Sequence, residues 1–169
     1  IAWYRQGRYS CTGTCIDIGM TTQLALQRFM ETGSPEAGNC SPRTAGNGSL
    51  MRLAPVPVFY HADLAAGVEA ARRQSIATHG AAEAVDACAA YAELLILAIN
   101  GRSKNEVLAH LIPDLAPAVA AVISGSWRNK SREQISSSGY VVHSLEAAIW
   151  CVAGASGFRE AVLLAANLG

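Results

Sequence analysis

A glycine-flanked turn is the first place in this chain where residue types and spacing suit ligand binding. Gly46 and Gly48 enclose Asn47, and Ser49 follows at the start of an apolar run. Glycine adopts backbone conformations that are closed to other residues, and a turn that opens a helix leaves amide N–H groups free where the helix dipole is positive. Such a turn can hold a phosphate. The spacing also fits a simple glycine turn with Ser49 as N-cap, and spacing alone favours that simpler interpretation.

Polar side chains around this turn offer further hydrogen bonds. Asn47 and Ser49 have the groups to bond a hydroxyl or phosphate oxygen of a ligand. Arg52 lies one turn into the expected helix, where it would either reach the same anion or bind a loop carbonyl. The sequence leaves both roles of Arg52 open.

An acid lies in a second unusual loop, residues 9–22. Asp17 stands between two isoleucines, and Gly19 follows two residues later. This arrangement fits a helix cap, which is the commoner use of such a residue, and it also fits an acid held in a cleft. Spacing does not choose between the two.

A histidine and a tyrosine are the remaining candidates. His79 lies at the end of a helical segment and is followed by Gly80, so the simpler interpretation is a capping histidine that interacts with the helix dipole. Tyr140 precedes a helix that is expected to begin at Ser144. It fits either a core aromatic or a ring that stacks on a base or lies along a guanidinium.

Helical periodicity runs through most of the chain and predicts an all-α fold in which loops carry the unusual chemistry. Residues 81–100 are dominated by Ala and Leu. Apolar residues would lie all around this helix, which is typical of a central helix. The expected apolar stripe of this helix is Val85, Cys88, Tyr91, Leu95 and Ile99. Further helices are predicted over residues 21–32, 62–78, 103–111, 114–124, 144–155 and 158–167, and residues 140–142 resemble a brief strand.

Composition restricts the class of protein. The 169 residues, with 51% hydrophobic and 15% charged side chains, fit one soluble globular domain. The 13 Lys and Arg residues balance the 13 Asp and Glu residues, and the best basic stretch, 127–132, fits a solvated loop, so we expect no nucleic-acid partner. No apolar run reaches about 18 residues and no secretory signal is present, so we expect no membrane partner and a cytoplasmic location.

Cysteine usage agrees with a reducing compartment. The five cysteines are odd in number and scattered, which does not fit a disulfide scaffold. Cys11, Cys15 and Cys40 lack the second close pair of ligands that a structural zinc site needs. We therefore expect free thiols and no zinc.

Four segments taken together resemble the ADP-ribosylglycohydrolase family. They are YSCTGTCIDIGMTT, AGNGSLMRLAPV, THG and SSGYVVHSLEAAIW, of which GNGSLMRLAPV and GYVVHSLEAA are the most specific. The similarity is closest to the bacterial branch that includes the dinitrogenase reductase-activating glycohydrolase, and it runs through nearly the whole chain.

This resemblance implies an all-α globule whose central cleft holds a pair of divalent cations, Mg²⁺ or Mn²⁺. It implies hydrolysis of the bond between ADP-ribose and an arginine nitrogen, a serine oxygen or a small leaving group. The partner would be an ADP-ribosylated protein or a small ADP-ribose conjugate. The glycine loop would lie along the phosphates, and the prolines Pro55 and Pro57 would end the short helix that the loop begins.

The resemblance also implies roles for individual residues. Asp17 matches the acid of the DIG motif beside the metal cleft, and His79 matches a histidine near the nucleotide. Tyr140 matches an aromatic residue at the cleft mouth. Met20 stands where the bacterial branch usually carries an asparagine that approaches the substrate. The phosphate and ribose loop is matched by Gly46, Asn47, Gly48 and Ser49.

The metal ligands of the family come from two aspartate motifs that this chain does not contain. We therefore expect residues 1–169 to be a single ADP-ribosylglycohydrolase-like domain, an internal fragment that lacks the N-terminal and C-terminal metal-binding segments and is inactive alone. The alternative is a non-catalytic member that binds ADP-ribose or is purely structural. Met20 is the feature that favours this alternative, because a polar contact is replaced by a thioether.

Overall fold

Helices and turns make up the structure, a computed structural model that describes residues 1–168. Within these residues there is no strand, and only two isolated β-bridges occur, so the all-α prediction is confirmed. The α-helices are α1 (Ala2–Gln6), α2 (Met20–Thr32), α3 (Gly48–Met51), α4 (Pro55–Phe59), α5 (Leu64–Ile76), α6 (Ala82–Ile99), α7 (Lys104–Ala109), α8 (Pro117–Ile123), α9 (Val141–Gly154) and α10 (Phe158–Ala166). The 3₁₀ helices are η1 (Pro42–Thr44) and η2 (Arg132–Gln134).

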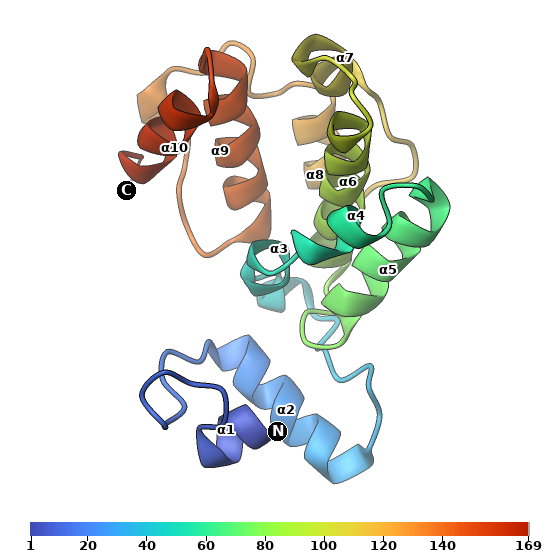
Figure 1. The fold of residues 1–169 in the computed structure, drawn as a ribbon, viewed down its shortest axis with the longest axis vertical. Helices are drawn as coiled ribbons and strands as arrows, with labels where there is room; N and C mark the ends of the chain where they lie inside the picture. The colour runs from blue at the N-terminus through green and yellow to red at the C-terminus, as the bar shows by residue number, and fades with distance from the viewer. Residues whose placement is uncertain (169) are drawn as a thin grey trace.

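The central helix is α6, as the sequence predicted. It packs against α5 most extensively and also contacts α3, α4, α7, α8 and α9. Figure 1 shows α4 and α5 on one side of it, α9 and α10 on the other, and the short α3 between the two groups. Helices α1 and α2 lie together at one end of the molecule, below α3 (Figure 1).

The buried face of α6 differs from the predicted stripe. Ile99 is 47% exposed, and Val85, Tyr91 and Leu95 are only partly buried. Apart from Ile96, which is 1% exposed, the fully buried positions are small, because small side chains let neighbouring helices pack closely on several sides of α6 at once. These buried residues are Ala84, Ala87, Cys88, Ala90 and Ala92.

The start of α9 also corrects a prediction. Residues 140–142 are not a strand, and the helix begins at Val141 instead of Ser144. Tyr140 is its extended N-cap residue and forms a single antiparallel bridge with Gly46. Val141 is completely buried, and its packing into the core favours the helical start over the strand preference of a β-branched residue.

The two prolines do not end the helix that the glycine loop begins. Helix α3 already ends at Met51 after about one turn, and Pro55 is in the first turn of a separate short helix, α4. Proline is well tolerated there because the amide it lacks has no partner within the helix at that position. Pro57 is buried in the same helix.

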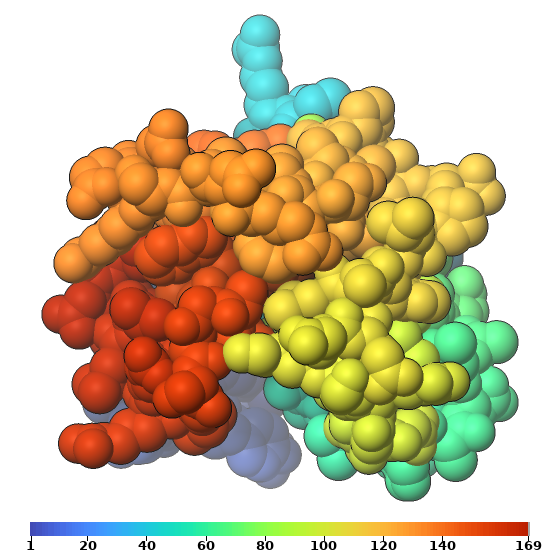
Figure 2. All heavy atoms as spheres, turned by 90° about the horizontal axis from the view of Figure 1, so that it is seen from above, coloured from blue at the N-terminus to red at the C-terminus, as the bar shows by residue number. Residues whose placement is uncertain are grey.

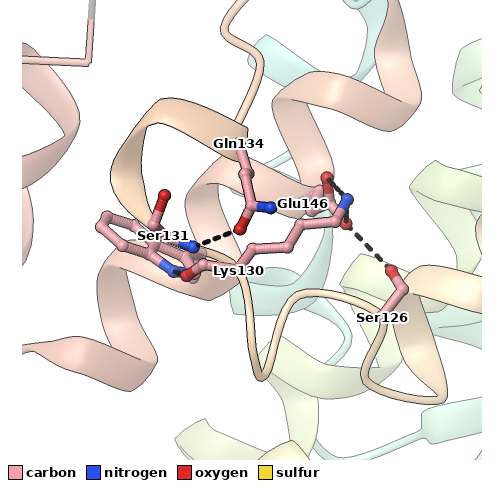
Figure 3. Close-up of polar contacts among 6 residues, drawn as sticks. Ser126, Lys130, Ser131, Gln134 and Glu146 are labelled. Carbon is pink, nitrogen blue, oxygen red and sulfur yellow. Dashed lines mark hydrogen bonds and ion pairs between the residues drawn. The ribbon is translucent and has the colours of Figure 1, made fainter.

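A partly buried ion pair joins the segment between α8 and α9 to α9 itself. Glu146 is 6% exposed, and Lys130 Nζ lies 2.7 Å from both of its carboxylate oxygens. Ser126 Oγ donates a third hydrogen bond to Glu146 at 2.9 Å (Figure 3). Because both oxygens have partners, the buried charge is compensated. Viewed from above, this segment (orange) meets α7 (yellow) and the C-terminal helices (red) at the end of the molecule opposite α1 and α2 (Figure 2).

All five cysteines are free thiols, and Cys88 and Cys151 are buried. Within residues 1–168, no helix combines the length and apolarity that a membrane span requires.

Candidate ligand-binding cleft

A cavity of about 300 Å³ lies between the start of α2, the glycine turn before α3 and the end of α5. It is therefore built from segments that are far apart in the sequence. Six of the eight predicted site residues line it. These are Asp17, Met20, Gly46, Asn47, Gly48 and His79.

Ser49 does not line the cavity, because its side chain points into the core. The residue is fully buried, and its hydroxyl lies 2.9 Å from Ser75 Oγ and 3.4 Å from the Sγ atom of Cys88. The prediction that this hydroxyl contacts a ligand is therefore wrong for this structure. Ser49 is not the N-cap either, since Asn47 occupies that position of α3.

The buried hydroxyl of Ser49 accepts hydrogen bonds from two sides, from Ser75 and from Cys88. Ser75 Oγ also lies 2.9 Å from the backbone oxygen of His79, which can only accept. The Ser75 hydroxyl donates to Ser49 Oγ and lies within donating distance of His79 O as well, so its one hydrogen is shared between these two acceptors, and the Cys88 thiol also donates to Ser49 Oγ. Burial raises the pKa of the Cys88 thiol, which keeps the thiol hydrogen in place. These hydrogen bonds hold the glycine turn, α6 and the His79 backbone together.

Arg52 binds the backbone and does not line the cavity. Its guanidinium donates from Nη2 to the backbone oxygen of Gln74 at 2.6 Å and from Nε to the Gln74 side-chain oxygen at 2.9 Å. Gln74 Nε2 in turn donates to the backbone oxygen of Ser49 at 3.1 Å. Of the two roles that the sequence left open, the structure therefore supports the one in which Arg52 holds carbonyls and fixes α3 on α5.

His79 is a buried residue whose ring faces the glycine turn. It is 3% exposed, and its Nδ1 atom lies 2.7 Å from Thr78 Oγ1. Burial, and secondarily the charge of Arg52, lower the pKa of His79 to about 4, so the imidazole is neutral at pH 7. A Cβ atom on Gly48 would lie 2.9 Å from His79 Cε1, which explains why glycine is needed at this position.

Asn47 connects the glycine turn to the start of α9. Its Nδ2 atom donates to Ser144 Oγ at 2.8 Å, and its backbone amide donates to Gly139 O at 2.9 Å. Among the described residues, its side-chain oxygen has no hydrogen-bond partner. That oxygen is a free acceptor on a residue that lines the cavity.

Asp17 and Met20 lie on the opposite wall of the cavity. Asp17 is exposed and has a left-handed backbone conformation with φ of 53°. It does not cap α2, whose N-cap is Gly19 without any side-chain cap, so of the two interpretations only the acid in a cleft fits the structure. Met20 is the first residue of α2 and is 76% exposed, so it is not a core residue.

Tyr140 does not line this cavity. Its ring is partly buried against the core and packs edge-on against His143, with ring centroids 4.9 Å apart. Burial and the neighbouring Glu83 raise the pKa of Tyr140 to about 12. Of the two roles that the sequence offered, the structure favours the packed aromatic, and the position at the cleft mouth is not reproduced.

Several residues that line the cavity were not among the predicted site residues. They lie near a helix start or in a short apolar run, where the type of a side chain does not indicate whether it lines a ligand site. Thr21 and Thr22 directly follow Met20, so their place at the predicted helix start could have indicated that they line the cavity. The missed residues are Trp3, Ile18, Gly19, Thr21, Thr22 and Met51.

Metal ligands are sparse in this part of the protein. Among residues 1–168, no group of three or more His, Cys, Asp or Glu side chains is placed to hold a metal ion. Asp17 supplies the one carboxyl group among the residues that line the cavity. Because Mg²⁺ and Mn²⁺ need several oxygen ligands, residues 1–168 by themselves do not fit a binuclear site.

Comparison with known proteins places these features in a family. A sequence model described as ADP-ribosylglycohydrolase matches residues 1–169. The chain is 46% identical over 168 residues to the ADP-ribosylarginine hydrolase Tri1 of Pseudomonas putida (strain GB-1), covering 99% of this chain and 45% of that protein. It is 39% identical over 169 residues to the ADP-ribosylarginine hydrolase Tri1 of Serratia proteamaculans (strain 568), covering 100% and 46%.

A solved structure supports the same assignment. A chain of an ADP-ribosylglycohydrolase-related protein complex superposes with a TM-score of 0.77 at 38% identity, covering 89% of this chain and 52% of that one. The chain thus spans about half the length of the relatives it matches.

Proposed function

Because this chain belongs to the ADP-ribosylglycohydrolase family, we propose that the protein hydrolyses ADP-ribosylated arginine and releases free ADP-ribose. The two curated relatives described above, both named ADP-ribosylarginine hydrolase, support arginine as the acceptor. The observation that carries the proposal is the cavity in which the DIG segment, the glycine turn and His79 come together.

The walls of the cavity suggest how the ADP-ribosyl group would bind. The glycine turn has no side chains at Gly46 and Gly48, so a diphosphate could approach the backbone there. The free side-chain oxygen of Asn47 is suited to accept a hydrogen bond from a ribose hydroxyl. The cavity volume of about 300 Å³ lies at the lower end of the range for small-molecule sites, which fits a cleft holding part of the ligand.

Asp17 and Met20 would face the reacting end of the substrate. Hydrolysis breaks the bond between the ribose and the arginine nitrogen, and water supplies a hydroxyl to the ribose and a proton to the nitrogen. The Asp17 carboxyl group is suited to assist this proton transfer, because it is exposed at the cavity wall. Met20 would contact the acceptor side through its thioether, where the bacterial branch usually carries an asparagine.

A pair of Mg²⁺ or Mn²⁺ ions remains a proposal for the whole protein. Such ions would polarise the ribose and help to position water. The residues described here supply only Asp17 to the cavity as a carboxyl ligand, and we therefore assign no step to the metal.

The decisive experiment measures release of free ADP-ribose from an ADP-ribosylated arginine peptide by the full-length protein with Mg²⁺ or Mn²⁺. Asp17→Asn should lower kcat at least tenfold. The matched control is Asp114→Asn, since Asp114 is also exposed and also left-handed, with φ of 57°, but lies outside the cavity. Absence of release from any ADP-ribose conjugate would overturn the proposal. Binding of ADP-ribose without release would support the non-catalytic alternative instead.

A further inference from the structure

Thr78 is buried beside His79. Thr78 is 8% exposed, and its hydroxyl oxygen lies 2.7 Å from His79 Nδ1. Among residues 1–168, this hydroxyl has no other hydrogen-bond partner. The contact is therefore specific for one nitrogen of the imidazole.

The other ring nitrogen of His79 faces the cavity. A Cβ atom added at Gly48 would lie 3.0 Å from Nε2, and one added at Gly46 would lie 3.5 Å from it, so the absence of side chains at these two glycines leaves the nitrogen uncovered on this side. Nε2 has no hydrogen-bond partner in the described part of the chain. Every fully buried side-chain nitrogen or oxygen atom there does have a partner, so Nε2 is not fully buried. It follows that Nε2 is accessible from the cavity.

The state of the ring follows from its surroundings. Burial and the Arg52 charge keep the imidazole neutral at pH 7, so one nitrogen carries hydrogen and the other accepts. If Nδ1 carried the hydrogen, the Thr78 hydroxyl would accept and its own hydrogen would have no acceptor in a buried place. If Thr78 donates to Nδ1, both groups are satisfied and the hydrogen lies on Nε2.

We propose that Thr78 is a positioning residue that holds the His79 ring as the Nε2–H tautomer, which presents a hydrogen-bond donor to an acceptor oxygen of the ligand in the cleft. The proposal deepens the proposed function, on which its ligand depends. The donor is fixed before the ligand arrives, because the backbone oxygen of His79 is held by Ser75 and the ring is held by Thr78. Such preorganisation lowers the cost of ordering the site on binding.

The first test is spectroscopic and does not depend on any activity. Long-range ¹⁵N–¹H correlation spectra of the full-length protein at pH 7 report which imidazole nitrogen carries hydrogen, and His79→Gln identifies the His79 signals among those of the other histidines. We expect the Nε2–H pattern in the unchanged protein, loss of that single pattern in Thr78→Val, and its return in Thr78→Ser. An Nδ1–H pattern in the unchanged protein, or an unaltered pattern in folded Thr78→Val, would overturn the proposal.

The second test measures binding of ADP-ribose by calorimetry. Thr78→Val should weaken binding about tenfold, and Thr78→Ser should restore it, because a hydroxyl at the same position again donates to Nδ1. Equal weakening by Val and Ser with an intact Nε2–H signal would overturn the positioning role. If the unchanged protein shows the Nε2–H pattern but binds no ADP-ribose, the proposed function fails while the tautomer assignment is supported.

Discussion

The Cε1 atom of His79 lies 2.9 Å from the place that a Cβ atom on Gly48 would occupy. This close approach couples the glycine turn to the segment after α5, although His79 lies 31 positions after Gly48 in the chain. It also explains why Gly48 is glycine even though its backbone is not left-handed.

We therefore expect Gly48→Ala to displace the His79 ring and weaken ADP-ribose binding at least tenfold, because the ring and turn cannot keep their present distance. Isothermal titration calorimetry of the full-length protein measures the change. The matched control is Gly139→Ala, since a Cβ atom there meets nothing within 4 Å and its oxygen still accepts from Asn47. Equal affinity of both variants would show that the contact has no role in binding.

Acid should destabilise the protein through His79. Its pKa is about 4 in the folded protein and near its ordinary value of 6.5 when unfolded, so below pH 6.5 the unfolded chain binds more protons and stability falls with falling pH. The loss is complete near pH 4 and amounts to about 3 kcal/mol.

Urea unfolding of the protein and of His79→Gln between pH 7 and pH 4.5 measures this effect. The free energy of unfolding should fall more steeply with acid in the unchanged protein than in the variant, which lacks the titrating ring. Parallel slopes would contradict the depressed pKa.

The ion pair between Lys130 and Glu146 should matter chiefly when one partner is removed. Lys130→Met leaves a carboxylate that is 8% exposed without its cation and should cost about 2 kcal/mol of unfolding free energy, less than for a fully buried pair because Lys130 is 34% exposed. The double variant Lys130→Met with Glu146→Leu should recover part of that loss. Thermal denaturation checks both values, and a double variant less stable than Lys130→Met would show that the pair is not the origin of the cost.

Met20→Asn should change the Michaelis constant for ADP-ribosylated arginine and leave the melting temperature nearly unchanged. The side chain is 76% exposed at the cavity wall, and exposed substitutions usually change stability by no more than about 0.5 kcal/mol. Steady-state kinetics and calorimetry of the full-length protein give the two numbers. A melting temperature lowered by several degrees with unaltered kinetics would place Met20 in the core and contradict the cleft assignment.

Local sequence patterns were sufficient to predict the positions of most of the longer helices. The predicted segments 21–32, 81–100 and 158–167 correspond closely to α2, α6 and α10, because helical periodicity and a glycine or asparagine at the end are local signals. The start of α9 was missed because Tyr140 and Val141 have strand preferences that burial overrides. The position of Pro55 within α4 was missed because proline ends one helix and begins another equally well.

The sequence by itself determined which segments are helical, and its resemblance to a known family predicted that the DIG segment, the glycine turn and the THG segment belong to one site. Only the tertiary structure decided which atoms of those segments are available. Ser49 and Gly48 are adjacent in sequence, yet one points into the core and the other lines the cavity. In a helix of a single turn, the pattern of residue types does not predict which side chains point into the core and which point into the cavity. That direction is set by the partners Ser75, Cys88 and His79, which the packing of α3 on α5 and α6 brings together.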